Sequence, residues 1–120
     1  MFITFEGMDG SGKSTQARLF ADYLKEKFGK ERVLHTREPG GTPIGEQIRE
    51  VVHSMRNQEM AARTEFLLYN AARAQVVAQV IRPALERGQV VLSDRFGDST
   101  LVYQGYGRQL DLDMVRNVIE

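Results

Sequence analysis

The amino-acid sequence predicts an α/β fold in which a parallel sheet is flanked by helices. Short β-prone segments alternate along the chain with longer segments of helical periodicity, which is typical of βαβ units. The first of the short segments runs directly into a glycine-rich turn and then a helix. The 120 residues fit one domain, and 42% of them are hydrophobic, enough to build a core. We therefore expect a single domain over residues 1–120.

The first part of the chain predicts two strands and two helices. Short apolar runs indicate the strands, and apolar residues at three- and four-residue steps indicate the helices. The predicted elements are a strand at 2–5, a helix at 13–28, a strand at 32–36 and a helix from 43 to about 55. Gly29 fits the C-terminal cap of the first helix, and Thr42 followed by Pro43 fits the start of the second.

The second part predicts one strand between helical segments. A long helical pattern begins near residue 62, Pro83 interrupts it and Gly88 ends it. The remaining predicted elements are a strand at 89–93, a helical stretch near Asp98, and a last helix capped by Asp111 and still running at Glu120. Three strands make a small parallel sheet, and the chain ends inside an apolar helical pattern, so we expect a truncated fold.

Composition narrows the class of partner. Sixteen basic residues balance sixteen acidic ones, which gives no general attraction to nucleic acid or membrane. The chain has no cysteine, which excludes disulfides, cysteine-bound zinc and a cysteine nucleophile. The N-terminus lacks the pattern of a signal peptide, and no apolar run approaches the roughly 20 residues of a membrane span. We expect a soluble cytoplasmic protein.

The glycine-rich turn matches the P-loop pattern G-x-x-x-x-G-K-[ST] between a strand and a helix. Its backbone N–H groups and the following helix N-terminus can cradle phosphates, the lysine can reach the β- and γ-phosphates, and the serine hydroxyl can bind Mg²⁺. A glycine-rich turn with a chance lysine is the simpler alternative. The predicted ATP-binding residues are Gly7, Met8, Asp9, Gly10, Ser11, Gly12, Lys13 and Ser14.

Asp94 and Arg95 follow the apolar strand at 89–93. A carboxylate there lies at the carboxyl edge of a parallel sheet, so we predict that Asp94 and Ser14 hold Mg²⁺, although Asp94 also fits a simple helix cap. The P-loop alone does not choose among kinase, GTPase and ATPase. Arg95 favours a phosphoryl acceptor that itself carries a phosphate.

Four segments together resemble bacterial thymidylate kinase in order and spacing, over the whole chain. They are Phe5-Glu6-Gly7, Thr36-Arg37-Glu38-Pro39-Gly40-Gly41-Thr42, Asp94-Arg95-Phe96 and Tyr103-Gln104-Gly105-Tyr106-Gly107-Arg108. The resemblance implies a P-loop NTPase fold of the nucleoside monophosphate kinase type. It also implies transfer of the γ-phosphoryl group of ATP to dTMP, with Mg²⁺, to give dTDP for dTTP synthesis. Members of the family are commonly homodimers.

The resemblance implies three catalytic residues, Asp9, Lys13 and Arg95. Arg95 matches the arginine that holds the dTMP phosphate. Asp9 resembles the carboxylate that contacts the dTMP sugar hydroxyl and helps to hold the phosphates, although many bacterial relatives have glutamate there.

The resemblance also implies a pocket for the thymine base. Tyr69 stands where the family places a ring stacked on the base, Arg73 resembles the arginine that contacts thymine O4, and Tyr103 resembles the ring that disfavours ribonucleotides. The other implied contacts are Arg37 and Glu38 in the loop facing the acceptor, Arg49 in the thymine pocket, and Thr100 and Gln104 as polar contacts to the base.

The residues alone leave a plainer interpretation of this pocket open. Tyr69 and Arg73 are four positions apart, so on a helix they share one face, but the same spacing fits a core-edge aromatic and a solvated charge. We assign no role to His35 or His53.

The chain departs from the family pattern in two ways. Phe96 replaces the more frequent tyrosine after Asp94-Arg95, which should leave both of those residues able to act. The lid that carries catalytic arginines in relatives lies outside the sequence, so we expect the N-terminal portion of an enzyme, weakly active or inactive by itself. The alternatives are another nucleoside or nucleotide kinase of the P-loop class and an inactive ATP-binding fragment.

Overall fold

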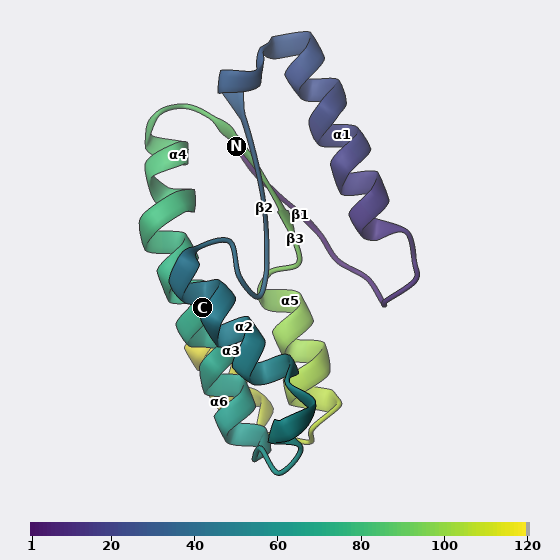
Figure 1. Cartoon of the computed structure of the whole chain (residues 1–120), viewed down its shortest axis with the longest axis vertical. Helices are drawn as coiled ribbons and strands as arrows, with labels where there is room; N and C mark the ends of the chain where they lie inside the picture. The colour runs from purple at the N-terminus through teal and green to yellow at the C-terminus, as the bar shows by residue number, and fades with distance from the viewer. Residues whose placement is uncertain (120) are drawn as a thin grey trace.

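The computed structural model describes residues 1–119 as a three-stranded parallel sheet with helices around it (Figure 1). The strands are β1 (Phe2–Phe5), β2 (Val33–Arg37) and β3 (Val90–Asp94), in the order β1-β3-β2. The predicted parallel sheet is confirmed, and the second and third strands each begin and end one residue later than expected. In this register Phe5 and Arg37 both lie opposite Asp94, so the three carboxyl ends meet at one edge.

Six α-helices and four 3₁₀ or π segments complete the described chain. The α-helices are α1 (Lys13–Phe28), α2 (Pro43–His53), α3 (Ala62–Val76), α4 (Arg82–Glu86), α5 (Gly97–Thr100) and α6 (Leu112–Ile119). The 3₁₀ segments are η1 (Lys30–Arg32) and η2 (Met55–Asn57), and the π segments are η3 (Val77–Ile81) and η4 (Leu101–Tyr106).

Most predicted helix ends agree with the structure. Gly29 ends α1 with its N–H donated to the Lys25 carbonyl, and Asp111 accepts a hydrogen bond from the Met114 N–H, at 2.7 Å. Helix α2 ends two residues earlier than expected. The predicted continuation of the last helix at Glu120 lies outside the described residues. The predicted interruption of the long helix at Pro83 is confirmed: α3 ends at Val76, the chain adopts π geometry over Val77–Ile81, and it continues as α4 with Pro83 near its start, which accommodates a residue that lacks an N–H.

The core lies on both faces of β3. Val91 and Leu92 are fully buried, and because neighbouring strand residues face opposite sides, each belongs to a different cluster. Leu92 packs with Ala21 and Leu24 of α1, whereas Val91 packs with residues of α3, η3 and α4. Figure 1 shows α1 on one side of the sheet and α4 on the other. A central strand covered on both faces explains the unbroken apolar run that predicted it.

Helices α2, α3, α5 and α6 lie beyond the carboxyl ends of the strands (Figure 1). The loop from β2 into α2 is fixed there by α2 itself. Glu46 accepts hydrogen bonds from the Gly41 N–H, at 3.1 Å, and from Arg37 Nη2, at 3.2 Å. Thr42 caps α2 by accepting the Gly45 N–H at 2.8 Å, as predicted. These contacts hold the loop that carries Glu38 at the edge of the sheet.

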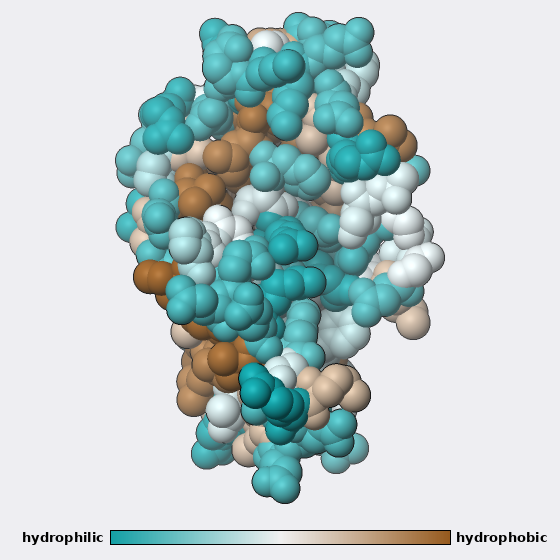
Figure 2. Space-filling model, in the orientation of Figure 1, coloured by the Kyte–Doolittle hydropathy of each residue, from teal (hydrophilic) through white to brown (hydrophobic). Residues whose placement is uncertain are grey.

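The surface is mixed in character. Figure 2 shows mainly hydrophilic residues on the face viewed, with hydrophobic residues gathered mostly toward its left side. Across residues 1–119, none of the helices has both the length and the apolar character needed to cross a bilayer.

Gly41 offers a sharp test of the loop. Its φ of +82° lies in the left-handed region, and an added Cβ would come within 2.5 Å of Thr36 Oγ1 and 2.8 Å of Val76 Cγ2. We expect Gly41→Ala to lower the free energy of unfolding by about 2–4 kcal/mol, through both backbone strain and crowding. The matched control is Gly88→Ala, where φ is +77° and no atom lies within 4 Å of the added carbon. It should cost about 1 kcal/mol in denaturant titrations, and equal losses in the two variants would contradict the crowding argument.

Glu46 makes the stability of the loop depend on pH. The Gly41 N–H and Arg37 hold the pKa of Glu46 below its usual value, against the smaller opposing effect of burial. A lowered folded-state pKa gives stability that is present above the ordinary glutamate pKa and lost as pH falls through the folded value. We expect Glu46→Gln to be less stable than the parent by about 1 kcal/mol or less near neutral pH, because the carboxylate is partly exposed, and equal to it in acid. Denaturant titrations across pH would measure this, and a difference that grows in acid would contradict it.

Candidate active site at the carboxyl edge of the sheet

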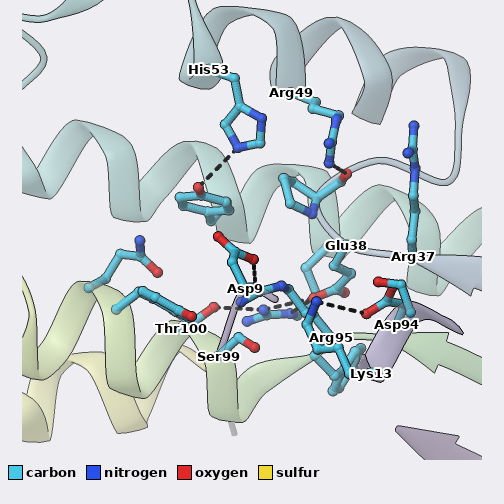
Figure 3. A pocket seen from close by; sticks show the side chains of 17 residues that line it. Asp9, Lys13, Arg37, Glu38, Arg49, His53, Asp94, Arg95, Ser99 and Thr100 are labelled. Atoms are coloured by element: carbon cyan, nitrogen blue, oxygen red, sulfur yellow. Dashed lines mark hydrogen bonds and ion pairs between the residues drawn. The ribbon is translucent and has the colours of Figure 1, made fainter. Parts of the chain in front are cut away.

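A cavity of about 390 Å³ opens at the carboxyl edge of the sheet (Figure 3). It is lined by the start of α1, the loop after β2, one face each of α2 and α3, and the segment from Asp94 through η4. All ten residues predicted to contact the acceptor line it: Asp9, Arg37, Glu38, Arg49, Tyr69, Arg73, Arg95, Thr100, Tyr103 and Gln104. Segments that are far apart in the sequence therefore meet at one place.

The predicted phosphate loop joins β1 to α1 beside this cavity. Gly10 and Gly12 have φ values of +79° and +86°, which glycine adopts without the steric cost of a Cβ. Gly12 precedes α1, whose N-terminus has neither a side-chain cap nor an acidic residue in its first turn. The first N–H groups of α1 are thus left for an anion. Lys13, Ser14 and Asp9 line the cavity; the other predicted loop residues, Gly7, Met8, Gly10, Ser11 and Gly12, do not.

Asp94 lies next to Lys13 and Ser14, the two P-loop side chains predicted to contact phosphate and Mg²⁺. Lys13 Nζ is 3.5 Å from Asp94 Oδ1, and the Ser14 hydroxyl donates to Asp94 Oδ2. Asp94 Oδ1 is buried and accepts no hydrogen bond within residues 1–119. A carboxylate and a hydroxyl suit Mg²⁺, which prefers oxygen ligands and usually completes its shell with water and substrate phosphate. The described residues contain no cluster of three acidic or histidine side chains, so such an ion would depend on those additional ligands.

Arg95 occupies a strained position at the end of β3. Its φ is +72°, uncommon for a residue with a Cβ, and its N–H donates to the Phe5 carbonyl at 2.9 Å. Its guanidinium pairs with Asp9 of the P-loop and lies 5.0 Å from the centre of the Tyr103 ring. Burial opposes the charge of Arg95, but Tyr103 and Asp9 raise its pKa above the usual value. The side chain is therefore a cation held between Asp9 of the P-loop and the Tyr103 ring.

Arg73 is buried, and so it is not a solvated surface charge. Its Nε donates to Glu38 Oε2 at 2.9 Å, and its Nη2 donates to Thr100 Oγ1 at 2.7 Å. Burial raises the pKa of Glu38, and the opposing effect of Arg73 is smaller. The Arg73 guanidinium also covers the Phe96 ring, 5.1 Å from its centre, and Phe96 packs edge-to-face on Phe2. The phenylalanine that departs from the family pattern is thus part of an apolar contact.

Tyr69 and Arg49 lie on the α2–α3 side of the cavity. The Tyr69 hydroxyl is 3.4 Å from His53 Nε2, and Arg49 Nη1 donates to the Pro39 carbonyl at 3.2 Å (Figure 3). Burial raises the pKa of Tyr69 and lowers that of His53. His53 is a cavity residue that the sequence reasoning left without a role. One feature of the sequence indicated a role for His53, its position on the helix that precedes the helix of Tyr69. That indication was insufficient, because the packing of the two helices against each other is a tertiary feature.

Glu6 is a second residue that the sequence reasoning left without a role. It accepts hydrogen bonds from the Phe96 N–H, at 2.8 Å, and from the Ser99 hydroxyl. It thereby ties the end of β1 to the beginning of α5, which carries Thr100. The partners are 90 and 93 residues away, so no local pattern could have indicated the contact.

Comparison with known proteins supports one family. The family model described as thymidylate kinase matches residues 5–120. The thymidylate kinase of Exiguobacterium sp. is 60% identical over 120 residues, which is 100% of this chain and 56% of that protein. The thymidylate kinase of Desulforudis audaxviator is 55% identical over 118 residues, which is 98% of this chain and 53% of that protein.

A solved structure gives the same result. The thymidylate kinase of Ehrlichia chaffeensis superposes with a TM-score of 0.93 at 43% identity, covering 98% of this chain and 65% of that one. The chain spans about half the length of the curated relatives that it matches. With the fold, the family model and these relatives in agreement, the chain belongs to the thymidylate kinase family.

Proposed function

We propose that the protein transfers the γ-phosphoryl group of ATP to dTMP, giving ADP and dTDP for dTTP synthesis. One observation carries this proposal: a single cavity is lined both by the P-loop residues Lys13 and Ser14 and by Arg95, Tyr69 and Arg73. A phosphate donor and a nucleotide acceptor can therefore lie end to end. The family membership of the chain supports the same reaction.

In this proposal the P-loop holds the donor. The N–H groups of the loop and of α1 donate hydrogen bonds to the phosphate oxygens of ATP, and Lys13 neutralises charge that develops on the β- and γ-phosphates. Ser14 and Asp94 would hold Mg²⁺, which when bound offsets negative charge on the donor. The dTMP phosphate is already a nucleophile, so these side chains need to position and neutralise rather than remove a proton.

The acceptor occupies the other end of the cavity. Arg95 binds the dTMP phosphate, Asp9 holds Arg95 and contacts the sugar, Tyr69 stacks on the base, and Arg73 donates to the C4 oxygen. The remaining proposed contacts are Thr100 and Gln104 to the base, Tyr103 beside the sugar, and Arg37, Glu38 and Arg49 around the acceptor loop.

The deciding experiment is a coupled ADP-release assay on the full-length gene product with ATP, Mg²⁺ and a panel of acceptors: dTMP, dUMP, CMP, AMP and deoxynucleosides. We expect dTMP to be the best acceptor. Lys13→Met should lower kcat by about 100-fold or more, because a charge that stabilises the transition state is lost. Lys30→Met is the matched control, since Lys30 is exposed in η1, and its activity should equal that of the parent.

Two results would redirect the proposal. Preference for another acceptor would indicate a different nucleotide kinase of the P-loop class. ATP binding without transfer to any acceptor would indicate an ATP-binding module.

We also propose that the protein is a cytoplasmic homodimer. Exposed apolar side chains on α2 and α3, among them Val51 and Leu67, support a helical interface, and the cysteine-free sequence is compatible with a reducing compartment. Light scattering of the full-length protein should give twice the subunit mass. Leu67→Glu should shift it toward monomer, whereas Leu19→Glu, on α1 and similarly exposed, should not. A parent protein that remains monomeric would contradict the dimer.

A further inference from the structure

Two facing helical segments are joined by side-chain hydrogen bonds above and below Tyr69. On α3, Glu65, Tyr69 and Arg73 are spaced four residues apart and so share one face. Opposite them, Thr100 and Gln104 are also four apart, at the end of α5 and in η4. Arg73 donates to Thr100 at 2.7 Å, and Gln104 donates to Glu65 at 3.0 Å. Tyr69 therefore lies between the two links.

The Glu65 carboxylate fixes which way the Gln104 amide points. Glu65 Oε1 accepts a hydrogen bond from Gln104 Nε2, and Glu65 Oε2 accepts one from Arg108 Nη2 at 2.8 Å. An ionised carboxylate can only accept hydrogen bonds, so the amide must turn its NH₂ group to Glu65 and its Oε1 away. Burial tends to raise the pKa of Glu65, but the Arg108 and Gln104 hydrogen bonds outweigh it and the pKa lies below its usual value. Glu65 is thus ionised, and acceptor-only, at neutral pH.

Gln104 therefore presents an acceptor. The side chain lines the cavity, and its Oε1 accepts no hydrogen bond from residues 1–119. Gln104 as a whole is buried, but among the described residues its Oε1 is not one of the buried side-chain atoms that lack a hydrogen-bond partner. This unbonded oxygen is therefore still accessible. It is available to a ligand.

Arg73 presents the opposite group. A guanidinium has five N–H groups and no acceptor. Nε and Nη2 of Arg73 both face Glu38, and Nη2 also donates to Thr100. Nη1 donates to Asn70, which leaves one N–H of Nη1 for a ligand. Around the Tyr69 ring the cavity thus offers a fixed donor at Arg73 and a fixed acceptor at Gln104.

We propose that Glu65 is a positioning residue that sets base specificity by holding the Gln104 amide with its oxygen toward the ligand. This arrangement accepts a pyrimidine with a carbonyl at C4 and an N–H at N3, as in thymine. Cytosine has the reverse pattern, an amino group at C4 and a bare N3, so it meets donor with donor and acceptor with acceptor. The inference rests on the proposed function, because it takes a nucleotide base to be the group stacked on Tyr69.

The test compares dTMP with dCMP in the full-length gene product and in Glu65→Gln. Glutamine can offer either an oxygen or an NH₂ group to Gln104, so the amide is free to turn over. We expect the ratio of kcat/KM for dTMP to that for dCMP to fall by about tenfold or more, the size expected when one discriminating hydrogen bond is released. The ratio of the dissociation constants, measured by calorimetry, should fall in parallel, and the melting temperature of each variant would register any loss of folding.

Arg108→Gln is the matched control. It removes the other partner of Glu65, at a side chain that is half exposed, but leaves the carboxylate facing Gln104. Its selectivity should stay within about twofold of the parent. An unchanged dTMP-to-dCMP ratio in Glu65→Gln would overturn the role of Glu65, and so would an equal fall of that ratio in Arg108→Gln. In either case dTMP kinase activity in the parent would leave the proposed function standing. A parent that neither binds nor phosphorylates dTMP would overturn both.

Discussion

The site depends on the register of the central strand. Because Asp94 of β3 lies opposite both Phe5 and Arg37, all three strands end at the same level, and the chain leaves each of them at one edge. Two backbone hydrogen bonds extend this pairing beyond the strands: the Glu38 N–H donates to the Asp94 carbonyl, and the Arg95 N–H donates to the Phe5 carbonyl, both at 2.9 Å. A slip of one residue would turn the side chains of β3 to the opposite faces, exchange the two halves of the core, and separate Asp94 from the P-loop.

Around that edge the protein buries charges that contribute little to stability by themselves. The Glu38–Arg73 pair is almost fully buried, and Glu38 Oε1 accepts no hydrogen bond within the described residues. Desolvating such a pair offsets much of its attraction, so an apolar pair of similar size would be equally or more stable. What the pair provides is orientation. It holds the Arg73 guanidinium in one plane, links it to Thr100, and so joins the loop after β2 to α3 and α5.

Three other acidic side chains orient residues of the cavity in the same way. Asp9 holds Arg95, Glu6 holds the start of α5, and Glu65 holds Gln104. In each contact an acidic side chain accepts from a donor distant in the sequence. Charge-assisted hydrogen bonds of this kind are directional, and they fix side chains of the cavity before any ligand arrives. The strained backbone at Arg95 fits this pattern, because it is held by Asp9 on the side chain and by Phe5 on the backbone.

The sequence by itself determined the features that arise from local rules. The strand–loop–helix order of the P-loop, the caps at Gly29, Thr42 and Asp111, and the buried strand ending in Asp94 follow from periodicity, glycine placement and side-chain hydrogen bonding over a few residues. Family resemblance added the acceptor contacts, all of which line the cavity, but it did not indicate His53. Only the tertiary structure decided the strand order, the π geometry before Pro83, and the contacts of Glu6, His53 and Glu65. Those contacts join residues 16 to 93 positions apart, and a hydrogen bond across such a separation leaves no local pattern, because it depends on how whole elements pack.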